Sequence, residues 1–189
     1  MDFENLKTEE NLVIKDLIVL TPDVYKDDRG FFFESWNQDK FNKILNKNII
    51  FCQDNHSRSS FGVLRGLHYQ IDPNPQGKLV RCTYGSIFDV AVDIRKDSST
   101  YGKWGGIELN SENKKQLWIP PGFAHGFLTL SKKAEVQYKT SGFWSKECER
   151  SIKWDDSKIN INWFKKINKI KPVLAKKDAF APSLDEAEI

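Results

Sequence analysis

The sequence predicts an all-β fold, a sandwich or barrel of short strands. Runs rich in Val, Ile, Phe and Trp recur at roughly the 8–12 residue spacing of such folds. Breaks that are polar or contain Gly and Pro separate these runs, at 21–23, 27–30, 72–77, 95–102 and 120–122. Strand-like runs never alternate with longer helices, so a parallel sheet built from βαβ units is not expected.

In chain order, each predicted strand is a short apolar run that one of these breaks ends. The runs lie at 12–20, 30–36, 49–54, 63–70, 78–84, 86–94, 104–109, 116–119, 126–130 and 134–144. Within the fourth and fifth runs, Val63, Leu64, Leu67 and Leu79 suit two buried strands.

Two segments depart from the strand pattern. A short helix is predicted near 38–47, because Phe41, Ile44 and Leu45 fall at positions i, i+3 and i+4. The C-terminal tail is predicted to hold short helical or irregular structure, because its prolines preclude a long helix.

We expect the 189 residues to form a single domain, 1–189, which is an ordinary size for one hydrophobic core. A β-barrel core spans about 12–155, and a C-terminal appendage spans about 156–189. The chain shows no internal repeat, linker or low-complexity tract.

Composition narrows the class of protein. The net charge of +3 is too small to indicate a nucleic-acid partner, and no zinc-finger spacing is present. No run approaches the ~20 apolar residues of a membrane-spanning helix, and the N-terminus MDFENLKTEE is unlike a signal peptide. A soluble cytoplasmic protein without a membrane partner is expected.

The three cysteines, Cys52, Cys82 and Cys148, are scattered along the chain. This spacing favours reduced thiols over disulfides.

The most informative stretch is 62–82, which reads GVLRGLHYQIDPNPQGKLVRC. It sets Arg65, His68, Lys78 and Arg81 on strand-like sequence. A general base, an anion binder and a cation are thereby placed beside one another on a rigid scaffold.

The first chemistry to consider is metal binding. A Pro-Pro-Gly turn precedes His125, as in many metal-binding double-stranded β-helices, but the other half of the chain offers only His68. One imidazole from each half gives two ligands, fewer than the three that a catalytic metal usually needs. No metal and no cofactor are expected.

The second chemistry is proton transfer without a metal. His68 has the near-neutral pKa that suits a base removing a proton beside a carbonyl, and Lys78 suits the enolate oxygen that forms. Inverting the carbon needs a proton donor on the opposite face. Among the candidate phenols Tyr69, Tyr84, Tyr101 and Tyr138, the last is the best choice, because its late strand could face the strand of His68.

The chain resembles the dTDP-4-dehydrorhamnose 3,5-epimerase family, cupin-fold enzymes that invert C3 and C5 of a 4-keto-6-deoxy sugar nucleotide. Eight strings in family order carry the resemblance: DDRGFFFES (27–35), QDNHS (53–57), VLRGLHYQ (63–70), QGKLVRC (76–82), FDVAVDIRKDSSTYG (88–102), QLWIPPGFAHGF (116–127), Tyr138-Lys139 and KDAFAP (177–182). The fold implied is a cupin-type double-stranded β-helix, or jelly roll.

Two positions depart from the family pattern. Phe143-Trp144 stands where the family usually has a Tyr-Tyr pair, so a phenol is lost while an aromatic face remains. Trp163-Phe164 replaces a usual Trp-Pro near the tail.

The resemblance implies a role for each matching residue. His68 is the base, Asp178 the carboxylate that orients it, Lys78 the enolate stabiliser and Tyr138 the opposing acid. The implied substrate-binding residues are Arg29, Glu34, Gln53, Asp54, Asn55, Arg65, His125, Phe143, Glu149 and Lys177. Family members form homodimers that exchange N-terminal strands, so Arg29 and Glu34 would serve the partner's site.

Each assignment has an alternative. Asp178 could cap the tail, with Asp89 or Asp93 as the partner of His68, and Lys78 could be a surface lysine. The Phe run at 31–33 is expected in the core or in dimer packing.

The function has alternatives as well. The leading hypothesis is a cofactor-independent epimerase that converts dTDP-4-dehydro-6-deoxyglucose into dTDP-4-dehydro-L-rhamnose. A 3-epimerase, or a 3,5-epimerase acting on another nucleotide sugar or a heptose, would keep the same fold and chemistry. A non-catalytic sugar-binding cupin and a metal-dependent cupin enzyme are the other candidates.

Overall fold

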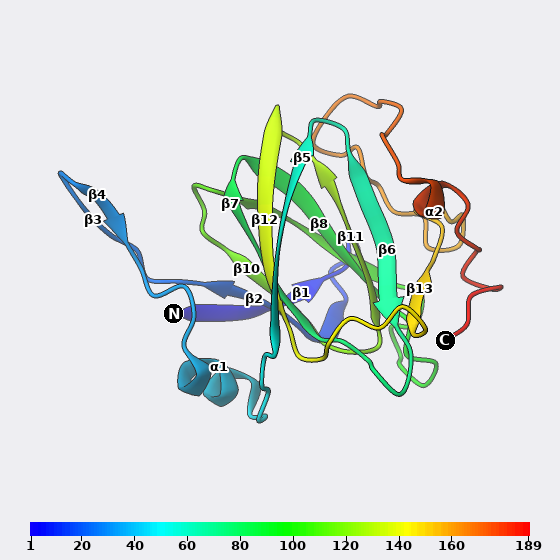
Figure 1. Cartoon of the computed structure of the whole chain (residues 1–189), viewed down its shortest axis with the longest axis horizontal. Helices are drawn as coiled ribbons and strands as arrows, with labels where there is room; N and C mark the ends of the chain where they lie inside the picture. Colours follow the sequence, from blue (N-terminus) through cyan, green and yellow to red (C-terminus); the bar gives the residue numbers. More distant parts are fainter.

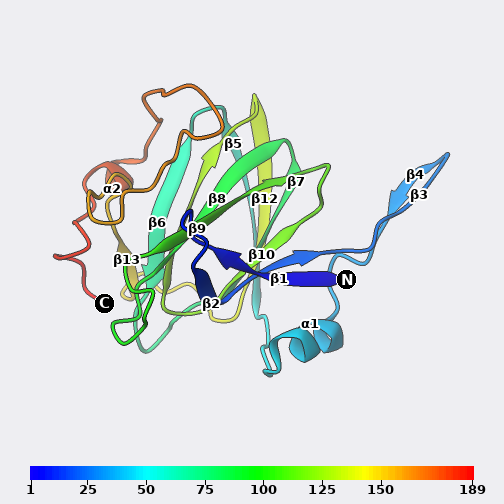
Figure 2. The same ribbon diagram turned by 180° about the vertical axis from the view of Figure 1, so that it is seen from behind.

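Two antiparallel β-sheets face each other in the computed structural model, which describes residues 1–189 (Figures 1 and 2). The six-stranded sheet has the order β1 (Asp2–Lys7), β2 (Val13–Thr21), β10 (Gln116–Ile119), β7 (Lys78–Tyr84), β12 (Lys133–Thr140) and β5 (Gln53–Ser60). The five-stranded sheet has the order β13 (Glu149–Ser151), β6 (Leu64–Gln70), β11 (Phe123–Thr129), β8 (Ser86–Asp93) and β9 (Trp104–Asn110). The predicted all-β fold is confirmed.

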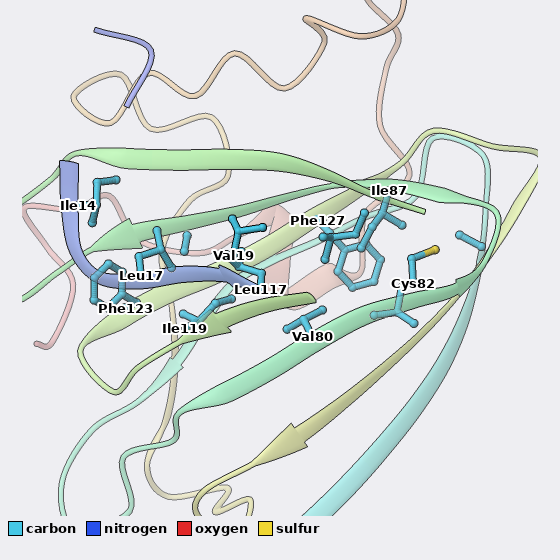
Figure 3. Close-up of a cluster of buried hydrophobic side chains, with 14 residues drawn as sticks. Ile14, Leu17, Val19, Val80, Cys82, Ile87, Leu117, Ile119, Phe123 and Phe127 are labelled. Carbon is cyan, nitrogen blue, oxygen red and sulfur yellow. The ribbon is translucent and has the colours of Figure 1, made fainter. Parts of the chain in front are cut away.

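The main core lies between the two sheets, where side chains from alternate strand positions meet (Figure 3). Val19 of β2, Val80 of β7 and Leu117 of β10 come from one sheet, and Ile87 of β8 and Phe127 of β11 come from the other. The side chains of both sheets thus share one apolar core between them.

A second cluster explains why β11 is buried along its whole length and β8 along all but its first residue. Phe88, Val90 and Leu128 point away from the first core and pack with Ile159 and Trp163 of the C-terminal segment. The C-terminal segment, orange to red in Figure 1, thus covers the outer face of the five-stranded sheet. This contact brings the end of the chain beside β6 and β13.

Most strand predictions are confirmed, and four begin or end at least three residues from the strand. The run at 126–130 starts late, because β11 begins at Phe123, and the run at 134–144 ends late, because β12 ends at Thr140. The runs at 78–84 and 116–119 match β7 and β10 residue for residue. The run at 49–54 is largely wrong, because β5 spans Gln53–Ser60, a polar sequence in which only Ser59 is buried. The run at 30–36 is strand only to Phe32, where β4 ends.

The pattern of apolar runs predicted neither β1 nor β13. Strand β1 is almost wholly exposed and pairs with β2, while β13 has three residues and pairs with β6. Pairing with a neighbour, rather than an apolar pattern, makes these segments strands.

Both predicted helical regions are present. Helix α1 (Gln38–Leu45) begins at Asn37, whose side chain accepts the backbone N–H of Lys40, and ends at Asn46 in the left-handed conformation. Its buried residue, Phe41, packs against Trp118 with ring centroids 5.3 Å apart. Helix α2 (Lys176–Ala179) is a single turn in the tail.

A small hairpin stands away from the body of the chain (Figures 1 and 2). It consists of β3 (Tyr25–Asp27) and β4 (Gly30–Phe32), which pair only with each other. Phe31 and Phe32 are 57% and 72% exposed, so they are not part of the core of this chain.

None of the helices combines the length and the apolar character needed to cross a membrane. All three cysteines are free, with Cys82 and Cys148 buried and Cys52 exposed.

Candidate active site

A pocket of about 450 Å³ opens between the two sheets and brings together most of the residues singled out in the sequence. Of the predicted site residues it is lined by Arg65, His68, Lys78, His125, Tyr138, Glu149, Lys177 and Asp178. These residues come from β6, β7, β11, β12, β13 and α2, segments that are far apart in the chain.

The floor of the pocket is formed where β6 and β11 approach closely. His68 and His125 are direct partners across the ladder of these two strands. Gly66 has a φ of +121°, and a Cβ placed there would lie 2.6 Å from Cα of Gly126. Only glycine at these positions lets the two histidine-bearing strands come so near each other.

His68 is held by a buried carboxylate. Its Nε2 lies 2.6 Å from Oδ1 of Asp178, which is 1% exposed and follows the base by 110 residues in the sequence. An ionised carboxylate accepts only, so Nε2 carries the proton and Nδ1 keeps the lone pair. Burial lowers the pKa of His68, and Asp178 partly opposes this, while the charges of Lys177 and Lys78 add to it. The imidazole is therefore neutral at pH 7 and able to accept a proton.

Lys78 is buried, so the alternative of a surface lysine is wrong. Its Nζ donates to the carbonyl oxygen of His68 at 3.3 Å. Burial lowers the pKa of Lys78 to about 8, although Asp89 and Glu149 oppose the shift. The ammonium form still dominates at pH 7, so a cation is available close to the base.

Tyr138 enters the pocket from the opposite sheet. It lies on β12, whereas His68 lies on β6, and both line the pocket. Burial raises the pKa of Tyr138, with Arg65 opposing and Glu149 adding to the rise. The phenol therefore keeps its proton at neutral pH and has one to donate.

A second imidazole–carboxylate pair lies next to His68, on strands β11 and β8. Nε2 of His125 is 2.7 Å from Oδ1 of Asp89, and the other carboxylate oxygen of Asp89 is buried without a partner. Asp93 binds Arg95, Ser98 and Thr100 instead. The alternative that Asp89 or Asp93 pairs with His68 is therefore wrong. The sequence analysis missed the Asp89–His125 pair, which no local sequence pattern signals, because only the pairing of β8 with β11 brings the two residues together.

Two further cationic groups line the pocket. The guanidinium of Arg65 donates to Oγ of Ser59 at 3.0 Å and has no carboxylate partner. Lys177 is different, since its Nζ lies 2.9 Å from Oε1 of Glu149. Arg65 is thus the cation better able to take up an anionic group of a ligand.

Six predicted residues lie outside the lining of the pocket. Gln53 and Asn55 bond to each other on β5, and Asp54 points to the other face of the sheet, where it pairs with Lys139 at 2.9 Å. The predicted role for Phe143 is not supported, because Phe143 is 67% exposed and its neighbour Trp144 lines the pocket instead. The Phe143-Trp144 dipeptide alone could not say which of the two rings turns inward.

The remaining two, Arg29 and Glu34, are far from the pocket within one chain. Arg29 binds Asp27 on the protruding hairpin, and Glu34 pairs with Lys40 at 2.8 Å. Neither contributes to the site of its own chain.

No three His, Cys, Asp or Glu side chains gather to form a metal-binding group. The prediction that the reaction needs no metal stays a prediction.

The fold and the site together define an enzyme that catalyses proton transfer in a pocket between two β-sheets. A neutral imidazole held by a carboxylate can remove a proton, a nearby ammonium can stabilise the resulting oxyanion, and a phenol from the facing sheet can return a proton.

The comparisons with known proteins define the family. The model of the dTDP-4-dehydrorhamnose 3,5-epimerase family matches residues 11–186, and this chain belongs to that family. It is 54% identical over 175 residues to the dTDP-4-dehydrorhamnose 3,5-epimerase of Salmonella typhimurium, covering 92% of this chain and 93% of that one.

Solved structures agree with this assignment and with the predicted cupin-type fold. The Legionella pneumophila dTDP-6-deoxy-D-glucose-3,5-epimerase, in complex with dTDP-4-keto-L-rhamnose, superposes with a TM-score of 0.89 at 43% identity, over 98% of this chain and 94% of that one. A 3'-monoepimerase from Streptomyces bikiniensis, in complex with dTDP-quinovose, gives 0.85 at 30% identity, over 92% and 86% of the two chains.

Proposed function

We propose that this chain converts dTDP-4-dehydro-6-deoxyglucose into dTDP-4-dehydro-L-rhamnose by inverting C3 and C5. His68 removes the proton beside the C4 ketone, and Lys78 stabilises the enolate oxygen that forms. Tyr138 then donates a proton to the opposite face of the same carbon. Once His68 has released its proton to water and Tyr138 has regained one from water, the same steps repeat at the second carbon, because C3 and C5 both adjoin the ketone.

One observation carries this proposal: the base and the acid enter one pocket from facing sheets. His68 and Tyr138 lie on β6 and β12, with the buried ammonium of Lys78 in the same lining. Inversion requires proton removal from one face of a carbon and proton return to the other. A non-catalytic sugar-binding protein would gain nothing from burying a lysine and an imidazole–carboxylate pair, which cost free energy to desolvate.

The identity of the relatives supports inversion at both carbons. The chain is more similar to the Salmonella and Legionella 3,5-epimerases than to the Streptomyces 3'-monoepimerase. The monoepimerase has the same fold, so the number of inverted carbons must depend on details of the pocket.

The test is an isotope experiment. Purified protein is incubated with dTDP-4-dehydro-6-deoxyglucose in D₂O, and deuterium at C3 and C5 is followed by NMR together with the configuration of the product. Incorporation and inversion at both carbons are expected, and the His68→Asn variant should show neither. Incorporation at C3 alone would indicate a 3-epimerase, and none at either carbon would refute the epimerase.

A second test removes metal ions. The protein should keep its full activity after EDTA treatment and desalting. A loss of activity that a divalent ion restores would refute the metal-independent reaction.

We also propose that the chain works as a homodimer whose N-terminal hairpins complete the partner's site. The hairpin β3–β4 projects from the body and leaves Phe31 and Phe32 uncovered, and Arg29 near its tip is 90% exposed at the side chain. Exposed aromatic side chains on a projecting hairpin are expected to be covered by another chain.

Mixing two impaired variants tests this proposal. Arg29→Ala and His68→Asn should each lower activity when alone. A mixed dimer of the two would hold one site with an intact His68 and the partner's intact Arg29, so mixing and re-equilibration should restore part of the activity. No restoration, or a monomer in light scattering, would contradict the exchanged dimer.

A further inference from the structure

The C-terminal segment 165–180 carries a large share of the positive charge of this chain. It contains six lysines, and its one carboxylate, Asp178, is buried against His68. Of the 29 basic and 26 acidic residues of the chain, 23 and 25 lie outside this segment, so the rest of the chain is slightly acidic. The net charge of +3 is therefore concentrated on one segment rather than spread over the surface.

The second half of this segment forms one wall of the pocket. Five of its residues line the pocket: Val173, Leu174, Ala175, Lys177 and Asp178. Backbone hydrogen bonds of Val173 with Gly62 and Leu64, at 2.9 and 3.0 Å, fix this part of the segment beside β6. Ile170 lies over Gly62, because a Cβ built on that glycine would be 2.8 Å from Cδ1 of Ile170. The chain from 170 to 178 therefore runs along the rim of the pocket and ends in α2, which lies beside β6 in Figure 1.

The six lysines differ in whether a carboxylate neutralises them. Three are paired at 3.4, 4.0 and 2.9 Å: Lys165 with Glu9, Lys166 with Glu108 and Lys177 with Glu149. The other three, Lys169, Lys171 and Lys176, are exposed and form no ion pair. Lys176 lies within the part that lines the pocket, and Lys169 and Lys171 come shortly before it. The charge that no carboxylate neutralises thus lies beside the pocket.

Exposed lysines of this kind attract an anion at long range but do not hold it in one place. A lysine ammonium is strongly hydrated and sits on a flexible stem, whereas the guanidinium of Arg65 in the pocket presents a rigid fork to phosphate oxygens. Positive charge gathered beside the opening of a cleft raises the local concentration of an anionic ligand and its association rate. The lysines outside the pocket and the arginine within it therefore suit successive stages of binding.

We propose that Lys169, Lys171 and Lys176 form an electrostatic funnel, which steers the anionic diphosphate of the substrate into the pocket without contacting it in the final complex. The proposal rests on the proposed epimerase function, which supplies the diphosphate. Steering of this kind raises association rates by about 10–10³-fold for a whole charged surface, and its effect falls with ionic strength. Charges at the rim of a binding site act on kon and its salt dependence more than on koff.

The experiment measures kon and koff for dTDP, the nucleotide part of the substrate, by stopped flow. Tryptophan fluorescence gives the signal, since Trp144 lines the pocket. At an ionic strength of about 0.1 M, where the Debye length is about 10 Å, Lys169→Gln/Lys171→Gln/Lys176→Gln should lower kon about 5-fold and leave koff within about 2-fold. At about 1 M, where the Debye length is about 3 Å, the difference from the wild type should vanish. The corresponding Lys→Arg triple variant keeps the charge and should match the wild type throughout.

A matched control variant removes the same charge at the opposite edges of the two sheets. Lys7 and Lys15 lie on β1 and β2, and Lys103 comes directly before β9. All three are exposed and form no ion pair, and none of these strands lines the pocket. At about 0.1 M ionic strength their charges are screened from the pocket, so Lys7→Gln/Lys15→Gln/Lys103→Gln should keep kon within about 2-fold of the wild type.

Steady-state kinetics of epimerisation give a second readout. The funnel variant should raise KM by about the same factor by which it lowers kon, with kcat within about 2-fold, because the groups that react are untouched. Circular dichroism should show unchanged folding, since all three substitutions are at exposed positions.

Failure of the funnel and failure of the epimerase are distinguishable, because the association of dTDP needs no catalysis. Wild-type protein that binds dTDP but incorporates no deuterium would refute the epimerase, and kon alone would then decide on the funnel. An unchanged kon in the funnel variant, or an equal loss in the control variant, would overturn the funnel. A faster koff at unchanged kon would show direct contact instead of steering, and a wild type that does not bind dTDP would refute both proposals.

Discussion

Replacing Asp178 by Asn is the perturbation that tests the structure most directly. The substitution keeps the size of a side chain that is 1% exposed, and it removes one charge from the 2.6 Å contact with His68. An amide can present either its oxygen or its NH₂ group to Nε2. When the NH₂ group faces the ring, the imidazole carries its proton on Nδ1 and has lost its base on the substrate side.

The size of the effect follows from what the carboxylate does. A charge-assisted bond to a buried group is worth about 1.5–3 kcal/mol, and a general base typically contributes about 10²–10⁴ in rate. We expect Asp178→Asn to lower kcat by about 10²–10⁴, equivalent to about 2.7–5.4 kcal/mol at about 1.36 kcal/mol per decade. KM should stay within about 3-fold, because no atom that binds the nucleotide is removed.

The pH dependence gives this prediction a sign. Asp178 raises the pKa of His68, so its loss lowers that pKa further. The base must be neutral to act, and therefore the acidic limb of kcat/KM should move to lower pH in the variant while the plateau falls. The assay is the rate of deuterium incorporation from pH 4 to 9, with circular dichroism as a check of folding. A plateau above one third of the wild-type value, or a limb that moves to higher pH, would show that Asp178 does not orient the base.

Three further predictions follow from the same site. Tyr138→Phe should incorporate deuterium but form little inverted product, because His68 still removes the proton and no phenol returns one to the other face; inversion at the wild-type rate would assign the acid to another group. Arg65→Ala should raise KM at least 10-fold while exchange persists at saturating substrate, because a bidentate guanidinium is lost; an unchanged KM would place the diphosphate elsewhere. Activity of the wild type should fall above about pH 8, where the ammonium of Lys78 loses its proton; a flat profile to pH 10 would mean that the charge of Lys78 is not used.

The fold was predictable where burial is expressed as apolar runs. Strands β7, β8 and β10 are buried along most of their length, and the runs that predicted them agree with their bounds to within one residue. Strand β5 was misplaced because its sequence, QDNHSRSS, is polar throughout, with only Ser59 buried and Ser57 bordering the pocket. A strand at the rim of a binding site lacks the apolar alternation on which such predictions depend.

The site was predictable to the extent that its chemistry is local in sequence. His68 and Lys78 lie ten residues apart on neighbouring segments, and their types alone indicated proton transfer. The pairing of Asp178 with His68 was implied only by the resemblance, since 110 residues separate them. Asp89 and His125 remained unpaired in the sequence analysis because only the register of β8 against β11 brings them together.

The charges of the pocket are arranged so that two cations remain available. Three nitrogen groups are each bound to a carboxylate, in the pairs His68–Asp178, His125–Asp89 and Lys177–Glu149. Arg65 and Lys78 have no such partner, and they bond only to neutral oxygen atoms. A nucleotide sugar undergoing this reaction carries a permanent negative charge on its diphosphate and develops another on the C4 oxygen. An exposed guanidinium suits the first, because it can be reached from solvent and binds phosphate oxygens bidentately. A buried ammonium suits the second, because an oxyanion that exists only transiently is stabilised most by a charge already in place and shielded from water.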